Sequence, residues 1–260
     1  MNRIEQAFQH KAIIPFLTCG DPDLETTGKL VRELVNAGAD LIELGIPFSD
    51  PTAEGPVIMD ADERALKNGV TTDQIFDLVI DLRKDVKIPL VFMTYANVIF
   101  SYGIERFMKR CEETGIDGII LPDVPYEEKD EFEGEAEKHG IAFIRMIAPT
   151  SEARIAKIAD GAKGFIYVVS SMGVTGTRKE ITTDIAALTG VVRSVTDTPC
   201  AVGFGISEPD QARRMAEMSD GAIVGSAIVK LIAKYGRDCV PHVKAFAASL
   251  AESVHGISGN

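Results

Sequence analysis

Glu43 is an acidic residue inside an otherwise apolar run, Leu41-Ile42-Glu43-Leu44-Gly45. Removing a carboxylate from water is costly, so burial in such a run is expected to raise the pKa of Glu43. A carboxyl group with a raised pKa can deliver or accept a proton near neutral pH, as a general acid or base does. The alternative is a structural Glu that neighbouring backbone groups or an Arg satisfy. Glu43 is the first candidate for chemistry.

A second acid, Glu54, follows in a proline-rich loop. Residues 47–56 read Pro-Phe-Ser-Asp-Pro-Thr-Ala-Glu-Gly-Pro and contain three prolines. Prolines fix φ and therefore restrict the conformations of a loop. A stiff loop could hold Glu54 opposite Glu43, which would place two carboxyl groups in one site. The alternative, which is common for an acid in a turn, is that Glu54 is exposed to solvent.

Glycine-rich segments in the second half of the chain could hold an anion. They are residues 173–176 (Gly-Val-Thr-Gly), residues 203–207 (Gly-Phe-Gly-Ile-Ser) and Gly225-Ser226. Glycine lets backbone N–H groups approach phosphate oxygens, and a helix beginning at Ser226 would point its positive end at the anion. A single glycine-rich segment is most simply explained by a tight turn of the backbone. Three near each other in a fold would favour a phosphate site.

Several other chemistries are not indicated by the sequence. No Lys stands at the end of an expected strand, which argues against Schiff-base chemistry. The widely spaced cysteines are read as reduced cytosolic thiols: Cys19, Cys111, Cys200 and Cys239. The histidines fall in helical or terminal contexts, so we expect no histidine base and no metal site: His10, His139, His242 and His255.

Eight short apolar runs, each followed by a segment with helical periodicity, would position these residues. The runs are Ile13–Thr18, Leu41–Leu44, Ile88–Thr94, Gly118–Leu121, Ile141–Ile147, Phe165–Val169, Pro199–Val202 and Ala222–Val224. This order is typical of a parallel sheet built from βα units. With no linker between units, it favours a single (β/α)₈ TIM barrel over residues 1–260. An open doubly wound sheet is the alternative.

Two details refine the barrel prediction. The segments after the second and sixth runs are oversized, and long connections at the carboxyl face are where barrel enzymes keep their chemistry. Three runs also follow similar short segments, here called lead-ins, at Ala37–Asp40, Thr114–Asp117 and Ser219–Ala222. Their aspartates Asp40, Asp117 and Asp220 suit the turn into the strand.

Residues 127–139 are nearly all charged and predict a solvated helix face.

Composition limits the partners and the location of the chain. The formal net charge of −12 over 260 residues argues against nucleic acid as a partner. Ile4, Ala7 and Phe8 suit a short amphipathic N-terminal helix and not a signal peptide. No apolar run approaches membrane-spanning length, so we expect a cytoplasmic protein.

Ordered motifs along essentially the whole chain resemble the α subunit of tryptophan synthase. They are Pro15–Pro22, Glu43–Gly55, Met93–Asn97, Leu121–Pro125, Gly173–Gly176, Gly203–Ser207 and Gly225-Ser226. The resemblance implies a barrel that cleaves indole-3-glycerol phosphate to indole and glyceraldehyde 3-phosphate without a cofactor or a metal. It also implies that indole passes to a pyridoxal phosphate β subunit, in an α₂β₂ complex.

The resemblance assigns roles residue by residue. Glu43 takes the general acid/base role, and Glu54 is the second acid beside the indole N–H. Pro47, Asp50 and Pro51 match the part of the loop that faces the β subunit. The substrate contacts carried over are Phe16, Tyr95, Tyr167, Thr175, Gly176, Phe204, Gly205, Gly225 and Ser226.

The sequence departs from the family near the second acid. The family usually has Asp where this chain has Glu54, an aliphatic residue in place of Thr52, and Gln in place of Met59. A longer acidic side chain could displace the carboxylate by about 1 Å, which can lower a rate by a factor on the order of a hundred. Two alternatives therefore remain: a weakened subunit that mainly activates a β partner by binding, and a free-standing lyase that releases indole.

Overall fold

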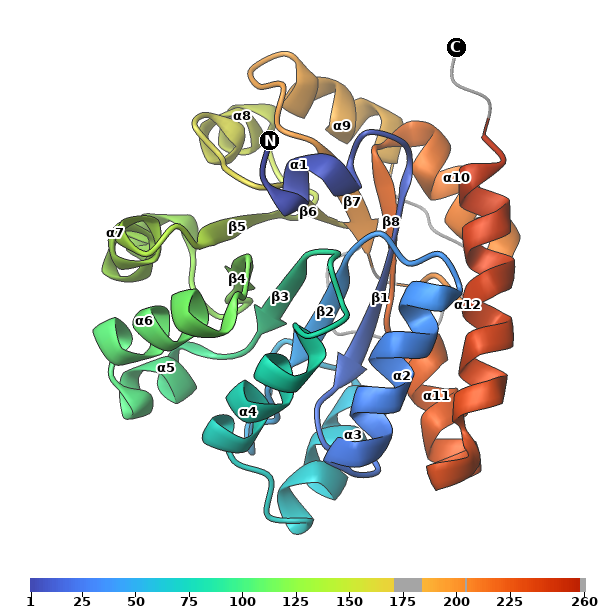
Figure 1. The fold of residues 1–260 in the computed structure, drawn as a ribbon. Helices are drawn as coiled ribbons and strands as arrows, with labels where there is room; N and C mark the ends of the chain where they lie inside the picture. Colours follow the sequence, from blue (N-terminus) through green and yellow to red (C-terminus); the bar gives the residue numbers. More distant parts are fainter. Residues whose placement is uncertain (171–183, 204, 258–260) are drawn as a thin grey trace.

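Eight parallel strands close into a barrel in the computed structural model, which describes residues 1–170, 184–203 and 205–257 (Figure 1). The strands are β1 (Ala12–Thr18), β2 (Ile42–Gly45), β3 (Leu90–Met93), β4 (Gly118–Ile120), β5 (Ala142–Ile147), β6 (Ile166–Val169), β7 (Cys200–Gly203) and β8 (Gly221–Val224). Each strand pairs with the next, and β8 pairs with β1 through Pro15 and Val224. This closure confirms the barrel and excludes the open sheet; no strand boundary differs from the prediction by more than two residues.

Helices surround the barrel (Figure 1). They are α1 (Arg3–Ala7), α2 (Leu24–Asn36), α3 (Pro56–Lys67), α4 (Thr72–Leu82), α5 (Ala96–Tyr102), α6 (Ile104–Thr114), α7 (Asp130–Lys138), α8 (Glu152–Ala159), α9 (Ile185–Arg193), α10 (Pro209–Met218), α11 (Ser226–Tyr235) and α12 (Val240–His255), with short 3₁₀ helices η1 (Tyr126–Glu128) and η2 (Gly236–Asp238). The expected N-terminal helix is present as α1. Among the described parts of the chain, no helix combines the length and apolarity needed to cross a bilayer.

The oversized segment after β2 contains an additional helix. Helix α3 lies between β2 and the outer helix α4. Pro56 is its first residue, where a missing N–H is tolerated, and Gly55 is its N-cap. An ion pair anchors α3 to the end of β1, because both Asp21 oxygens accept hydrogen bonds from Arg64 at 2.8 Å. The loop carrying Glu54 is therefore held at both ends by regular structure.

Strand alternation places Glu43 inside the barrel. Ile42 and Leu44 belong to the outer apolar layer between the sheet and the helices. Glu43 points the other way, beside Phe16 on β1 and Val91 on β3, which are its register partners in the sheet. All four residues of β2 are buried, as the apolar run predicted.

The repeated Asp residues stabilise the amino ends of neighbouring strands. Each carboxylate accepts a hydrogen bond from a backbone N–H of the preceding strand: Asp40 from Ile13 at 2.8 Å, Asp117 from Leu90 at 2.9 Å and Asp220 from Cys200 at 2.9 Å. Each also lies within 4.0 Å of at least one basic side chain. The similar lead-ins thus have a structural role at the end of the barrel away from Glu43.

The charged segment 127–139 is less solvated than predicted. Glu133 on α7 is buried and accepts two hydrogen bonds from Arg145, at 3.0 and 2.8 Å. Arg145 also donates to the carbonyl oxygens of Ile158 and Asp160. The solvated face is present at Glu131, Glu137 and Lys138, and Glu133 departs from it because its partner comes from β5, a pairing that no local pattern indicates.

We predict that Asp117→Ala lowers the free energy of unfolding by about 3 kcal/mol, because Arg83 and the Leu90 N–H lose a mostly buried partner. The Asp117 carboxylate lies 2.6 Å from Arg83, and both side chains are mostly buried. Asp77→Ala is the control, since Asp77 is 72% exposed and 3.7 Å from Arg110. Urea denaturation that shows equal effects for the two substitutions would contradict the proposed role of Asp117.

Candidate active site

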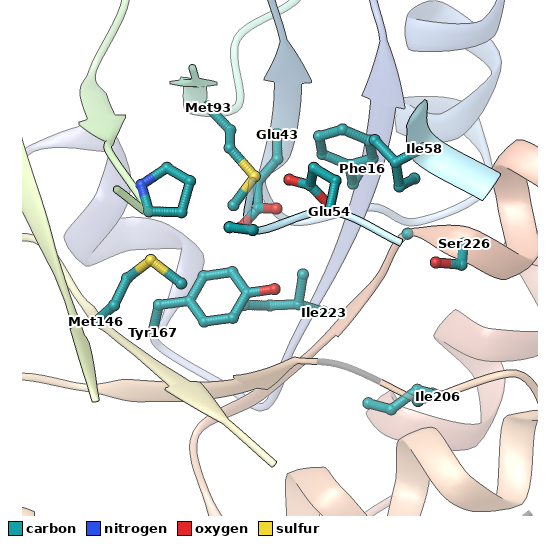
Figure 2. Close-up of a pocket in the computed structure, with 14 residues that line it drawn as sticks. Phe16, Glu43, Glu54, Ile58, Met93, Met146, Tyr167, Ile206, Ile223 and Ser226 are labelled. Carbon is teal, nitrogen blue, oxygen red and sulfur yellow. The ribbon is translucent and has the colours of Figure 1, made fainter. Parts of the chain in front are cut away.

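A pocket opens at the carboxyl ends of the barrel strands (Figure 2). The hollow and the open solvent at its mouth together span about 550 Å³. The lining residues are Phe16, Glu43, Ala53, Glu54, Ile58, Met93, Pro122, Met146, Tyr167, Gly205, Ile206, Ile223, Gly225 and Ser226. Most of this surface is apolar, which suits a flat hydrophobic ring with a few polar anchors.

Glu43 is the most deeply buried acid of the pocket. Its side chain is 1% exposed, and its Oε1 atom has no hydrogen-bond partner among the described residues. Burial raises the pKa of Glu43 well above its ordinary value, and the nearby Glu54 raises that pKa further. The alternative of a Glu satisfied by an Arg is therefore excluded for the described residues. The carboxyl group is held ready to carry a proton.

Glu54 faces the same pocket from the loop before α3 (Figure 2). The side chain is 6% exposed, so the alternative of a solvent-exposed acid is wrong. Its backbone N–H donates to the carbonyl oxygen of Pro51 at 3.1 Å. The preceding N–H, of Ala53, donates to the hydroxyl of Tyr95 at 3.2 Å. The loop thus fixes Glu54 through backbone contacts and not through its prolines alone.

Tyr95 supports this loop from behind. Its ring stacks on Phe48 with 5.2 Å between the ring centroids. Tyr95 is absent from the described pocket lining, so its contribution there is to position residues 48–54. Burial raises the pKa of Tyr95, and the hydroxyl stays neutral and able to accept the Ala53 N–H.

Asp62 is a third buried carboxyl group that the sequence analysis missed. It lies on α3 and is 5% exposed. Burial and the charge of Glu54 raise the pKa of Asp62 to about 8. The sequence held a signal for it, because Ile58, Ala61, Asp62 and Ala65 share the helical spacing of a buried face. Asp62 can therefore hold a proton next to the loop of Glu54.

Two strand glycines make room for aromatic rings inside the barrel. A Cβ atom on Gly203 would lie 2.3 Å from the hydroxyl oxygen of Tyr167, and one on Gly45 would lie 2.6 Å from the ring of Phe16. Both aromatic residues line the pocket, as expected. Gly203 was predicted to form part of a phosphate cradle; the described contacts give it a packing role at Tyr167.

The start of α11 provides the polar end of the pocket. Gly205, Gly225 and Ser226 all line it, and Ser226 is the first residue of this helix. The first N–H groups of a helix have no partner within the helix and carry partial positive charge. This end of the pocket can therefore bind a phosphate group.

The remaining predicted site residues are distributed as follows. Thr175, Gly176 and Phe204 lie outside the described residues. Pro47 and Pro51 are buried in the loop after β2, whereas Asp50 is exposed and accepts a hydrogen bond from Ser49.

The expectation of no metal site stays a prediction, although the fold brings together one group of side chains with metal-ligand chemistry. His10, Asp40 and His255 come together at the amino end of the barrel, where Asp40 precedes β2. Residues so distant in sequence showed no motif spacing, so only the fold reveals the group.

Comparison with known proteins gives one consistent result. Residues 3–255 match the family described as Tryptophan synthase alpha chain. The alpha chain from Lacticaseibacillus casei is 48% identical over 255 residues, covering 98% of this chain and 96% of that protein. A crystal structure of the alpha chain from Legionella pneumophila is 35% identical, with a TM-score of 0.88 and complete coverage of both chains. A tryptophan synthase complex from Pyrococcus furiosus is 34% identical with a TM-score of 0.86, covering 93% of this chain and 98% of that one.

We predict that Asp62→Asn stabilises the fold increasingly as pH rises. Because the pKa of Asp62 is raised to about 8 on folding, the folded parent holds a proton between about pH 4 and pH 8 that the unfolded chain has released. The parent therefore loses stability across this window, by up to about 1.4 kcal/mol per pH unit, while the amide does not titrate.

Urea denaturation of parent and variant at both ends of the window measures this difference. Asp60→Asn, on the exposed side of α3, is the control and should show little change. A gap between parent and Asp62→Asn that does not vary with pH would refute the assignment.

Proposed function

The chain belongs to the tryptophan synthase alpha chain family, and from this premise we propose that Glu43 and Glu54 carry its lyase reaction. The reaction is the cleavage of indole-3-glycerol phosphate to indole and glyceraldehyde 3-phosphate. The observation that supports this most directly is the Glu43 carboxyl group, buried without a described partner on Oε1 and facing Glu54 in an apolar pocket.

The first step places a proton on the ring carbon that bears the glycerol chain. Glu43 has a raised pKa and therefore carries a proton that an ordinary Glu would have lost. When Glu43 donates it, positive charge develops toward the indole nitrogen. The carboxylate of Glu54, beside the indole N–H, stabilises this charge in a site with little water.

The second step breaks the carbon–carbon bond. Glu43, now ionised, accepts the proton of the glycerol hydroxyl next to that bond. The oxygen lone pair forms the aldehyde, and the electrons of the broken bond return to the ring to give indole. Glu43 ends with a proton and is ready for the next cycle, so protons balance without a cofactor.

Substrate orientation follows from the two ends of the pocket. The phosphate group is held by backbone N–H groups at Gly225 and Ser226, at the start of α11. The indole ring lies among apolar side chains that include Phe16 and Met93. This arrangement directs the reacting carbon toward Glu43.

The partner we propose is the tryptophan synthase β subunit, a pyridoxal phosphate enzyme, in a cytoplasmic α₂β₂ complex. The similar structure from Pyrococcus furiosus is described as a tryptophan synthase complex. Asp50 is exposed beside the buried Pro47 and Pro51 on the loop after β2. Exposed apolar side chains stand on nearby segments at the same end of the barrel, with Met59 45% and Phe100 49% exposed.

Glu54 also supports a second candidate function, because the family usually has Asp there. In this candidate the subunit acts mainly by binding and activating the β subunit. Indole formation from indole-3-glycerol phosphate, measured with and without a β subunit and combined with a pull-down, separates the candidates. Rapid indole release without any β binding would instead identify a free-standing lyase.

We predict that Glu43→Gln lowers the rate of indole formation at least about 100-fold, because the amide keeps the shape but cannot transfer the proton. Binding of glycerol phosphate, followed by calorimetry, should stay within about twofold, since the phosphate end is unchanged. Glu63→Gln is the control and should keep parent activity, because Glu63 lies on α3 with its side chain 62% exposed. Substantial indole release by Glu43→Gln would remove Glu43 from the mechanism.

We predict that Glu54→Ala slows indole formation because it loses about 3–4 kcal/mol of transition-state stabilisation. Glu54→Asp should keep much of the activity. The two substitutions separate loss of charge from a change of length. Steady-state rates in the presence of the β subunit measure both. If Glu54→Ala matches the parent, the second carboxylate is not catalytic. If the parent itself shows no cleavage while it still activates the β subunit, the binding function is supported.

A further inference from the structure

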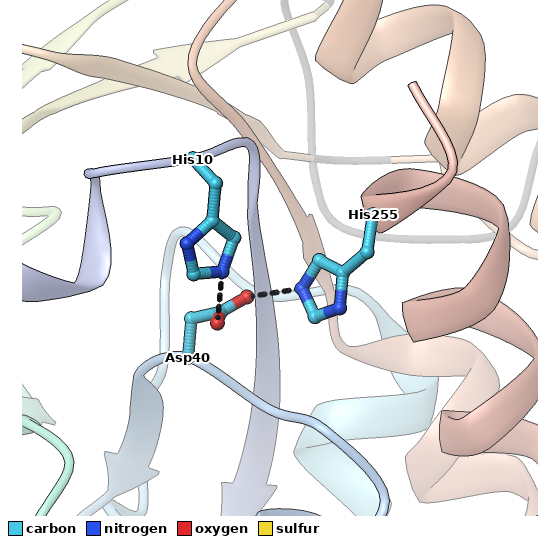
Figure 3. A group of neighbouring side chains, drawn as sticks. All are labelled: His10, Asp40 and His255. Atoms are coloured by element: carbon cyan, nitrogen blue, oxygen red, sulfur yellow. Dashed lines mark hydrogen bonds and ion pairs between the residues drawn. The ribbon is translucent and has the colours of Figure 1, made fainter. Parts of the chain in front are cut away.

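His10, Asp40 and His255 form a compact group at the amino end of the barrel (Figure 3). The Nε2 atom of His10 lies 2.8 Å from Oδ1 of Asp40, and the Nε2 atom of His255 lies 2.8 Å from Oδ2. The two rings meet edge to face, with 4.9 Å between their centroids. One ligand atom from each residue lies within 4.8 Å of the others.

Asp40 is the fixed member of this group. Its side chain is 11% exposed, and Oδ2 accepts a hydrogen bond from the Ile13 N–H at 2.8 Å. Its own N–H donates to the carbonyl oxygen of Ile13 at 3.1 Å. Both bonds connect to β1, so the barrel itself orients the carboxylate. Outer contacts that orient a ligand in this way are a regular feature of metal sites.

The two histidines approach from opposite ends of the chain. His10 follows α1, whose Ile4 and Ala7 are buried against the barrel, and His255 is the last residue of α12. Their side chains are 53% and 32% exposed, so each ring can rotate toward a shared ion without disturbing the core. Each imidazole can carry its proton on Nδ1, which leaves the Nε2 lone pair for a metal.

We propose that His10, Asp40 and His255 bind one divalent transition-metal ion, with Zn²⁺ as the preferred physiological ion. Two imidazole nitrogens and one carboxylate oxygen match the ligand types of zinc, and water can complete a four-coordinate site. Imidazole ligands disfavour Mg²⁺ and Ca²⁺, which select oxygen. The net charge of −12 also favours a cation over an anion.

The bound ion joins three segments that are otherwise held separately. It connects the N-terminal segment, the start of β2 and the end of α12. A ligand that binds only the folded chain stabilises it, and here the stabilised region includes both chain ends. The ion lies at the barrel end opposite the pocket, so it acts on stability and not on the lyase reaction.

Isothermal titration calorimetry with Zn²⁺ on the tag-free, chelator-treated full chain tests the proposal. We expect one ion per chain, and at 100-fold excess over the dissociation constant a rise in Tm on the order of 5 °C. His10→Gln and His255→Gln should each weaken binding at least about tenfold. Glutamine keeps a hydrogen-bond donor for Asp40, so these variants separate metal binding from simple hydrogen bonding.

His242→Gln is the matched control on the same helix. His242 stacks on Tyr235, 3.6 Å away, and should leave Zn²⁺ affinity unchanged. Mg²⁺ should produce neither binding heat nor a Tm shift. Absence of Zn²⁺ binding, or equal binding by the parent, His10→Gln and His255→Gln, would overturn the proposal and leave a hydrogen-bonded His–Asp–His group. Loss of binding only in His242→Gln would place the metal elsewhere and would also overturn it.

Discussion

Burial of the Glu43 carboxyl group is the constraint on which the rest of the site depends. A strand of a closed barrel must point alternate residues inward, and on β2 the inward position carries an acid. An ionised carboxylate is strongly disfavoured in an apolar interior, so burial raises the pKa of Glu43 well above its ordinary value. The fold thereby places a carboxyl group of raised pKa at the bottom of the pocket, and the proposed mechanism uses it as the proton donor.

The surrounding structure maintains this condition. Gly45 and Gly203 allow Phe16 and Tyr167 to fill the barrel beside Glu43, which limits water around the carboxyl group. Helix α3 and Tyr95 hold Glu54 close enough to raise the pKa of Glu43 further. At the other end, aspartates such as Asp117 secure the strand ends by side-chain bonds to backbone N–H groups. The candidate active site and the aspartates that secure the strand ends thus lie at opposite ends of the barrel.

Local sequence patterns predicted the barrel and singled out Glu43 and Glu54 as candidate site residues. These predictions succeeded because strands, turns and the burial of an acid in an apolar run depend on neighbouring residues. The apolar run around Glu43 predicted burial, and the strands lie within two residues of their expected positions. Contacts between distant segments could not be predicted in this way: the His10–Asp40–His255 group, the Glu133–Arg145 pair and the packing of Gly203 on Tyr167. Asp62 differs, because its helical spacing with Ile58, Ala61 and Ala65 is a local pattern that indicates burial from the sequence.

The proposed mechanism requires Glu43 to be protonated before substrate binds. Infrared difference spectroscopy between the parent and Glu43→Gln, on the substrate-free chain at about pH 6, detects the carbonyl stretch of a protonated carboxyl group. An ordinary Glu is ionised at that pH. We expect a protonated-carboxyl band in the parent that is lost on substitution. A carboxylate band in its place would show that Glu43 is ionised before substrate binds, and Glu43 could not then be the proton donor of the first step.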